Sequence, residues 1–188
     1  MRALSRFVNG IEAVVRLFGW IAAWTCVALV LMVAGDVFVR YLFRTGAVWL
    51  QELQWHLISP IALFGMSYAL YCGEQVRVDV LFERFPAWLA RVIEVVGGLA
   101  LMAFAAYAAY LAYPWVMQSW LRGESSPNPG GLPYRWALKG LIPLGFGLLA
   151  LQGLAHALRH GFGLRNPENA SQHAPQTGAG AGTRTTGH

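Results

Sequence analysis

The chain has 188 residues, of which 56% are hydrophobic and only 12% are charged. Soluble domains carry about 25% charged residues, so the composition argues against an ordinary soluble domain and indicates a membrane protein. The formal net charge is +5, but the basic residues lie singly between apolar runs. This scatter indicates orientation in a membrane rather than a nucleic-acid partner.

The first apolar segment predicts a transmembrane helix over residues 14–40. Residues 1–16 carry Arg2, Arg6 and Arg16 and repeat apolar residues at near-helical spacing, which predicts an amphipathic lead-in at the membrane surface. Residues 17–35 contain no charge. This run is longer than a signal-peptide core and has no clear small-residue cleavage site, so a span is preferred to a signal peptide.

Two charged residues close this span. Asp36 and Arg40 are four residues apart, so they share one helix face and can pair. A charge facing lipid is costly, although the cost falls near the end of a span. Two interpretations stay open: a helix end whose charges reach the headgroups, or a polar anchor for a helix of another subunit.

A second span is predicted over residues 50–72. At its start, Trp49, Glu52 and His56 have a spacing that places them on one helix face. The tryptophan suits a membrane–water interface. After Gly73 the charges return, and apolar residues at helical spacing predict an amphipathic surface helix near residues 77–86.

The third span is predicted over residues 88–121, which is longer than a membrane crossing needs. Glu94 enters its start and is expected to pair or to reach the interface. The fourth span is predicted over residues 136–159. The polar, glycine-rich residues 163–188 predict a disordered tail.

Between the third and fourth spans lies a polar loop of unusual composition. Three prolines and two glycines fall between Pro127 and Pro133, so neither a helix nor a sheet ladder can continue through it. Pro127 and Pro129 keep the residues before them extended, and the two glycines supply a turn. We therefore expect a stiff, shaped connection.

The expected fold is an all-α membrane protein with four transmembrane helices and an amphipathic surface helix between spans two and three. Residues 1–162 form the membrane domain and residues 163–188 the tail. Four spans place both termini on one side, and most of the 14 lysines and arginines fall on that side. The positive-inside rule then predicts cytoplasmic termini and a polar loop that faces outward.

The sequence carries no motif of a soluble enzyme: no GxSxG, P-loop, HExxH or CxxC. A haem-binding or structural anchor subunit of a respiratory complex is one alternative, with His56 and His156 as ligands. Their predicted depths place them near opposite ends of the spans, too far apart to share one iron. A channel or pump is a second alternative, but the predicted span middles lack ionisable residues.

The order of motifs resembles the small membrane subunit of tripartite ATP-independent periplasmic (TRAP) transporters. The matching segments are DVFVRYLF at residues 36–43, WLQE at residues 49–52, Gly65 and Gly73, and VRVDV at residues 76–80. The segment at residues 124–139 resembles the branch often labelled mannitol/chloroaromatic or 2-oxo-acid transport. The resemblance covers about residues 10–160.

The resemblance implies a subunit that braces a large multi-span permease and helps an extracytoplasmic binding protein to dock, for sodium-driven uptake of an organic acid. It implies a bacterial inner membrane, contact with lipid, and neither an enzymatic activity nor a cofactor or metal. The residues expected to contact the large subunit are Asp36, Arg40, Trp49, Glu52 and His56. Those expected to dock the binding protein are Arg122, Glu124, Asn128, Tyr134 and Arg135.

Overall fold

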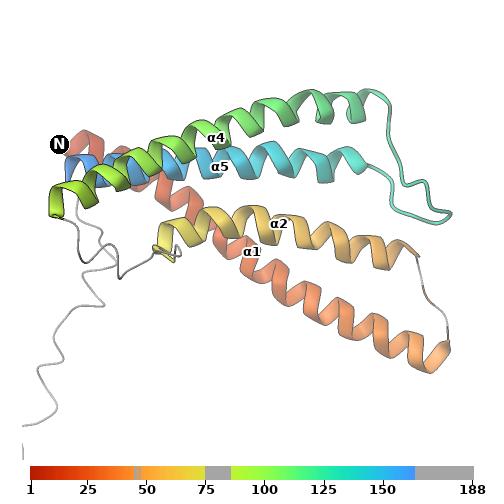
Figure 1. Cartoon of the computed structure of the whole chain (residues 1–188). Helices are drawn as coiled ribbons and strands as arrows, with labels where there is room; N and C mark the ends of the chain where they lie inside the picture. Colours follow the sequence, from red (N-terminus) through yellow and green to blue (C-terminus); the bar gives the residue numbers. More distant parts are fainter. Residues whose placement is uncertain (45, 47, 75–85, 164–188) are drawn as a thin grey trace, which may run out of the picture.

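The computed structural model describes residues 1–44, 46, 48–74 and 86–163, and within these ranges the chain is all-α (Figure 1). Its four helices are α1 (Arg2–Phe43), α2 (Val48–Cys72), α4 (Ala87–Leu121) and α5 (Arg135–Phe162). Their number, order and type confirm the predicted helices, and the described ranges contain no strand. The predicted surface helix lies outside the described residues apart from Pro86, and so does the predicted tail beyond Gly163.

The helices run alternately up and down, so that the bundle has two distinct ends (Figure 1). The end of α1, the start of α2 and the α4–α5 connection lie together; this is the loop end. The N-terminus, the start of α4 and the end of α5 lie together at the opposite, N-terminal end. The first turns of α1 and the last turns of α5 therefore lie at the same end of the bundle.

Helix α5 is the centre of the bundle, because it packs against α1, α2 and α4. Its buried residues join three apolar clusters: Ala155 meets Val8 and Tyr71, Leu148 meets Ala22 and Phe64, and Leu149 meets Leu70 and Ala105. The outer helices leave many large apolar side chains exposed, including Leu31 and Phe38 of α1 and Phe104 and Tyr110 of α4. Such exposed surface suits lipid or another membrane subunit.

Small residues let α4 and α5 approach closely. A Cβ atom added at Gly98 would lie 3.0 Å from the carbonyl oxygen of Gly153 and 3.0 Å from the backbone nitrogen of Ala157. Conversely, a Cβ at Gly153 would lie 3.0 Å from the oxygen of Gly98. Contacts of this kind between small residues are a common way for membrane helices to associate.

The N-terminal segment corrects one prediction. Residues 1–16 are not a separate surface element; they are the first turns of the continuous helix α1. Val8 and Val15 are fully buried, packed with Tyr71 and Ala155. Part of the apolar face that predicted a membrane-surface helix is therefore covered by α2 and α5, whereas Phe7 and Val14 of the same segment stay exposed. Periodicity alone does not say whether lipid or protein covers a face.

By length and composition, three of the described helices can cross a membrane: α1, α5 and the Trp88–Leu121 part of α4. These correspond to the predicted spans 14–40, 136–159 and 88–121. Helix α2 is long enough but less apolar, with Gln51, Glu52, Gln54 and His56 in its first turns. The second span remains a prediction.

Candidate functional site

The α4–α5 loop at the loop end is folded back on itself. Ser126 N–H donates to the carbonyl oxygen of Leu132 (3.1 Å), and Arg135 N–H donates to the carbonyl oxygen of Glu124 (3.1 Å). Gly130, with φ of 77°, makes the reversal at the tip. The loop thus has a defined shape, as its prolines and glycines predict.

Glu52 of α2 holds this loop against the bundle. Its Oε1 accepts hydrogen bonds from the Ser126 hydroxyl and from Asn128 Nδ2 (2.8 Å), and its Oε2 accepts one from the Leu132 N–H (2.7 Å). One carboxylate therefore ties both arms of the loop to α2. Charged acceptors make stronger hydrogen bonds than neutral ones, so Glu52 is the main polar link between α2 and the loop.

The base of the loop is closed by a second carboxylate. Glu124 Oε2 accepts hydrogen bonds from the Ser119 hydroxyl (2.7 Å) and from Lys139 Nζ, which joins the end of α4 to the start of α5. Its hydrogen bond to Lys139, followed by that to Ser119, lowers the pKa of the Glu124 carboxyl from 4.5. The rings of Trp120 and Trp136 pack edge to face beside it, with centroids 4.3 Å apart.

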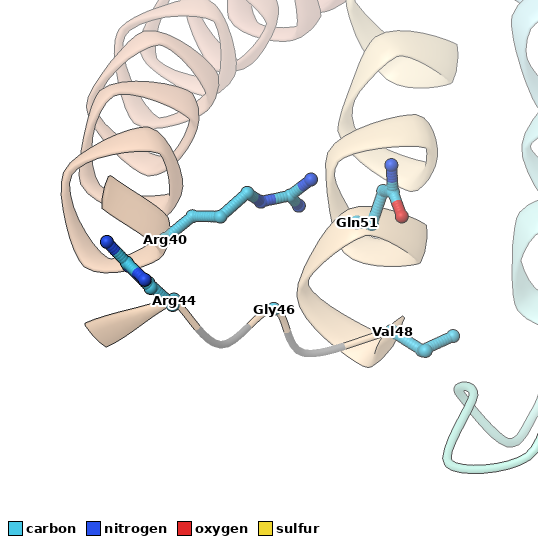
Figure 2. A pocket seen from close by; sticks show the side chains of 5 residues that line it. All are labelled: Arg40, Arg44, Gly46, Val48 and Gln51. Atoms are coloured by element: carbon cyan, nitrogen blue, oxygen red, sulfur yellow. The ribbon is translucent and has the colours of Figure 1, made fainter. Parts of the chain in front are cut away.

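Two neighbouring hollows open at the loop end. One has a volume of about 290 Å³ and is lined by Arg40, Arg44, Gly46, Val48 and Gln51. Figure 2 shows the Arg40 side chain extending from α1 toward Gln51 of α2. Arg40 also donates to Asp36 Oδ2 at 3.0 Å, as its spacing predicts, but half of its side-chain surface stays exposed.

The second hollow, of about 230 Å³, lies between α2 and the loop. Glu52 and His56 line it from α2, Asn128 from the loop, and Arg135 from the start of α5. His56 Nδ1 is 2.7 Å from the carbonyl oxygen of Glu52, and its buried Nε2 has no hydrogen-bond partner among the described residues. This hollow therefore brings a guanidinium, a carboxylate and an imidazole together.

The structure brings together residues that the sequence assigned to two separate surfaces. Glu52 and His56, predicted to contact a large subunit, share a hollow with Asn128 and Arg135, predicted to dock a binding protein. Trp49, Arg122 and Tyr134 are exposed and do not line it. Asp36 is buried and Glu124 is partly buried.

Sequence reasoning missed the residues that complete these contacts. They are Ser119, Ser126, Leu132 and Lys139. Glu52 lies 74 residues from Ser126 and 80 from Leu132, so spacing along the chain gives no signal for their pairing. The Lys139–Glu124 pair spans one loop, and the opposite charges at its two ends could have suggested it.

The two histidines of the haem alternative lie far apart. His56 is near the start of α2, at the loop end, whereas His156 is near the finish of α5, at the N-terminal end (Figure 1). Their side chains have different neighbours: His56 meets the Glu52 backbone, and His156 Nε2 lies 2.7 Å from Glu94 Oε2. The predicted separation of the two histidines is confirmed.

Comparison with known families decides the class of protein. Residues 29–161 match the family described as tripartite ATP-independent periplasmic transporters, DctQ component. The match runs from the middle of α1 to the end of α5 and covers most of the chain. This chain belongs to the DctQ family. It is a transmembrane component of a TRAP transporter and not an enzyme. Among curated proteins, no sequence matches it.

The matched range covers the loop end of the bundle but omits the first turns of α1. The matched range includes both hollows and the whole Glu52-bound loop. It excludes the first 28 residues, although Val8 and Val15 in that segment are fully buried against α2 and α5. The N-terminal turns of α1 are therefore an integral part of this DctQ bundle.

Proposed function

We propose that this DctQ subunit braces the large permease subunit of its transporter and helps the extracytoplasmic binding protein to dock at the loop end. The observation that carries the proposal is the attachment of a stiff, polar loop to α2 through Glu52. A preformed loop loses little conformational freedom when a partner binds, which favours recognition.

The bracing role is supported by the surface of the bundle. Helix α4 packs along α5, while much of its remaining surface carries exposed aromatic and aliphatic side chains. The part of α1 nearest the loop end is similarly exposed. We propose that the large subunit contacts the loop end through Asp36, Arg40, Trp49, Glu52 and His56.

The docking role is supported by charge at the same end. The loop end carries more basic than acidic side chains. The five basic ones are Arg40, Arg44, Arg122, Arg135 and Lys139, and the three acidic ones are Asp36, Glu52 and Glu124. All three carboxylates are already engaged within the chain. The arginines therefore leave a positive excess toward an arriving protein, and such charges mainly raise the rate of association. Arg122, Glu124, Asn128, Tyr134 and Arg135 are the proposed contacts.

In the proposed orientation, all four helices span a bacterial inner membrane, α2 included, and both termini are cytoplasmic. The positive-inside rule supports this orientation, and α2 is long enough to span. The first turns of α2 are polar because they include Glu52, which accepts hydrogen bonds from the loop. This polar start lowers the hydropathy of α2. The loop then faces the compartment of the binding protein.

The proposed transport reaction is sodium-driven uptake of an organic acid, with substrate and sodium carried by the large subunit. The sequence at residues 124–139 supports the mannitol/chloroaromatic or 2-oxo-acid branch. Reconstitution into liposomes of this chain with its large subunit and binding protein tests the proposal. Uptake should require a sodium gradient and all three proteins. Equal uptake after omission of this chain would overturn its assigned role.

A further inference from the structure

Three potential metal ligands meet at the N-terminal end of the bundle, away from the loop end. They are Glu94 near the start of α4 and His156 and His160 near the end of α5. One ligand atom from each residue lies within 4.8 Å of the other two. The residues come from the two helices that pack most closely, through Gly98 and Gly153.

The local geometry prepares these groups to share a cation. The histidines are four residues apart on α5, with ring centroids 4.3 Å from each other. His160 Nδ1 lies 2.9 Å from the carbonyl oxygen of His156. Donation of an N–H from Nδ1 to that carbonyl leaves the His160 Nε2 lone pair available, which is how a backbone acceptor commonly orients a metal-ligating histidine.

We propose that Glu94, His156 and His160 form a binding site for a divalent transition-metal ion of the Zn²⁺ type. Two imidazoles and one carboxylate suit such ions, whereas Mg²⁺ and Ca²⁺ prefer oxygen ligands. Zn²⁺ binds these ligands at about 2.0–2.2 Å. The three ligand atoms now lie within 4.8 Å of one another. Side-chain rotations would bring each of them to its binding distance from one shared ion.

Binding replaces one interhelical contact with a stronger one. His156 Nε2 and Glu94 Oε2 are now 2.7 Å apart, in hydrogen-bond contact. With the metal present, the His156 proton resides on Nδ1 and both groups donate lone pairs to the cation. His156 is buried, while Glu94 and His160 are partly exposed, so a water molecule has access to complete the coordination. The ion would link α4 to α5 where the bundle ends.

Metal titration of the full chain tests the site. The chain is purified in nanodiscs through a tag without histidine, stripped with chelator, and titrated with Zn²⁺ by calorimetry and with Co²⁺ by visible absorption. We expect one equivalent to bind and to raise the unfolding temperature, because a ligand of the native state stabilises it. His160→Gln, which leaves the Glu94–His156 contact in place, should weaken binding by at least about tenfold.

A rescue variant separates metal binding from a purely structural histidine. His160→Cys supplies a thiolate, another good zinc ligand, and should restore binding that His160→Gln loses. The control is the double variant His173→Gln/His188→Gln, which removes the histidines beyond α5 and should bind as the wild type does. Absence of saturable binding to folded wild type, or binding lost only in the control, would overturn the proposal.

Discussion

Arg159 in the last turn of α5 donates hydrogen bonds to both carboxylate oxygens of Glu12 near the start of α1. Its Nε donates to Oε1 and its Nη2 to Oε2, and Nη2 also donates to Asn9 Oδ1 at 3.2 Å. Both partners of the ion pair are buried, with 4% of Glu12 and 8% of Arg159 exposed. This bidentate geometry gives Arg an advantage over Lys for binding a carboxylate. The pair fixes α1 to α5 beside the cluster that contains Val8 and Val15.

Arg159→Met should destabilise the bundle strongly, because it leaves the Glu12 charge buried without its partner. Breaking a buried ion pair in this way costs about 3–5 kcal/mol. Thermal unfolding of the purified chain measures the loss. The double variant Glu12→Leu/Arg159→Met should recover most of it, since paired apolar side chains can replace a buried ion pair. A double variant as unstable as Arg159→Met alone would contradict this account.

Gly98→Ala should separate α4 from α5, whereas the neighbouring Gly97→Ala should not. A Cβ at Gly98 would meet backbone atoms of α5 at 3.0 Å, while one at Gly97 would have nothing within 4 Å. Overpacking of this kind costs about 1–3 kcal/mol, and alanine at the open position should stabilise the helix by up to about 1 kcal/mol. Opposite shifts in unfolding temperature are expected; equal shifts would contradict the close approach.

The sequence predicts the helices well because their signal is local. Apolar runs free of charge, with prolines and glycines between them, predict all four described helices, and four-residue spacing predicts the Asp36–Arg40 pair. Partners distant along the chain leave no such signal. Glu12 and Arg159 are 147 residues apart, and their contact depends on the packing of α1 against α5.

The candidate site could be predicted only in outline. Proline and glycine content predicts a shaped loop between α4 and α5. The attachment of the loop to Glu52 could not be predicted, because it depends on how α2 lies against α5. Lys139 illustrates the same limit: its ammonium lies 5.3 Å from the Trp115 ring centroid while it binds Glu124, contacts that require the folded α4–α5 pair.

Acid should open the base of the α4–α5 loop. Hydrogen bonds from Lys139 and then Ser119 lower the pKa of Glu124 from 4.5. A lowered native pKa contributes stability above pH 4.5, and this stability is lost as the pH falls through the native pKa. Protease cleavage within residues 122–134 should therefore accelerate below pH 4.5 in the wild type. Glu124→Gln should be cleaved faster at neutral pH and change less on acidification; an identical pH profile would contradict the assignment.

Glu52→Leu should release the loop from α2 and weaken co-purification of the large subunit. The substitution removes the acceptor for Ser126, Asn128 and the Leu132 N–H together, so several polar groups lose their partner. Cleavage of the loop should become several-fold faster. Arg40→Leu is the comparison variant. Arg40 lines the neighbouring hollow and forms an ion pair with Asp36, not with the loop residues that bind Glu52.

Arg40→Leu should lower the yield of the complex without speeding loop cleavage. The two substitutions thus separate contact with the large subunit from attachment of the loop. Complex yield and transport unchanged by both substitutions would contradict the proposed large-subunit contact. Faster cleavage after Arg40→Leu would instead show that the two hollows are coupled within this chain.

Reversal of two charges at the loop end should impair docking of the binding protein while the membrane complex still assembles. Arg122 is exposed and Arg135 is partly exposed, and neither donates one of the Glu52 hydrogen bonds. Charges at the rim of an interface mainly affect association rate and salt dependence. With Arg122→Glu/Arg135→Glu, half-maximal uptake should require roughly tenfold more binding protein, and less of that difference should remain at high salt.

The matched control is Arg165→Glu/Arg184→Glu, which makes the same change of charge beyond α5 and should leave this concentration dependence unaltered. If the loop only caps α4 and α5, the loop-end variant should instead lose assembly, with normal dependence on binding protein in the complexes that remain. Its contacts make this outcome a real alternative, since Trp120 and Trp136 pack at the loop base. Measuring complex yield and uptake in the same preparation separates the two roles, because docking affects uptake alone.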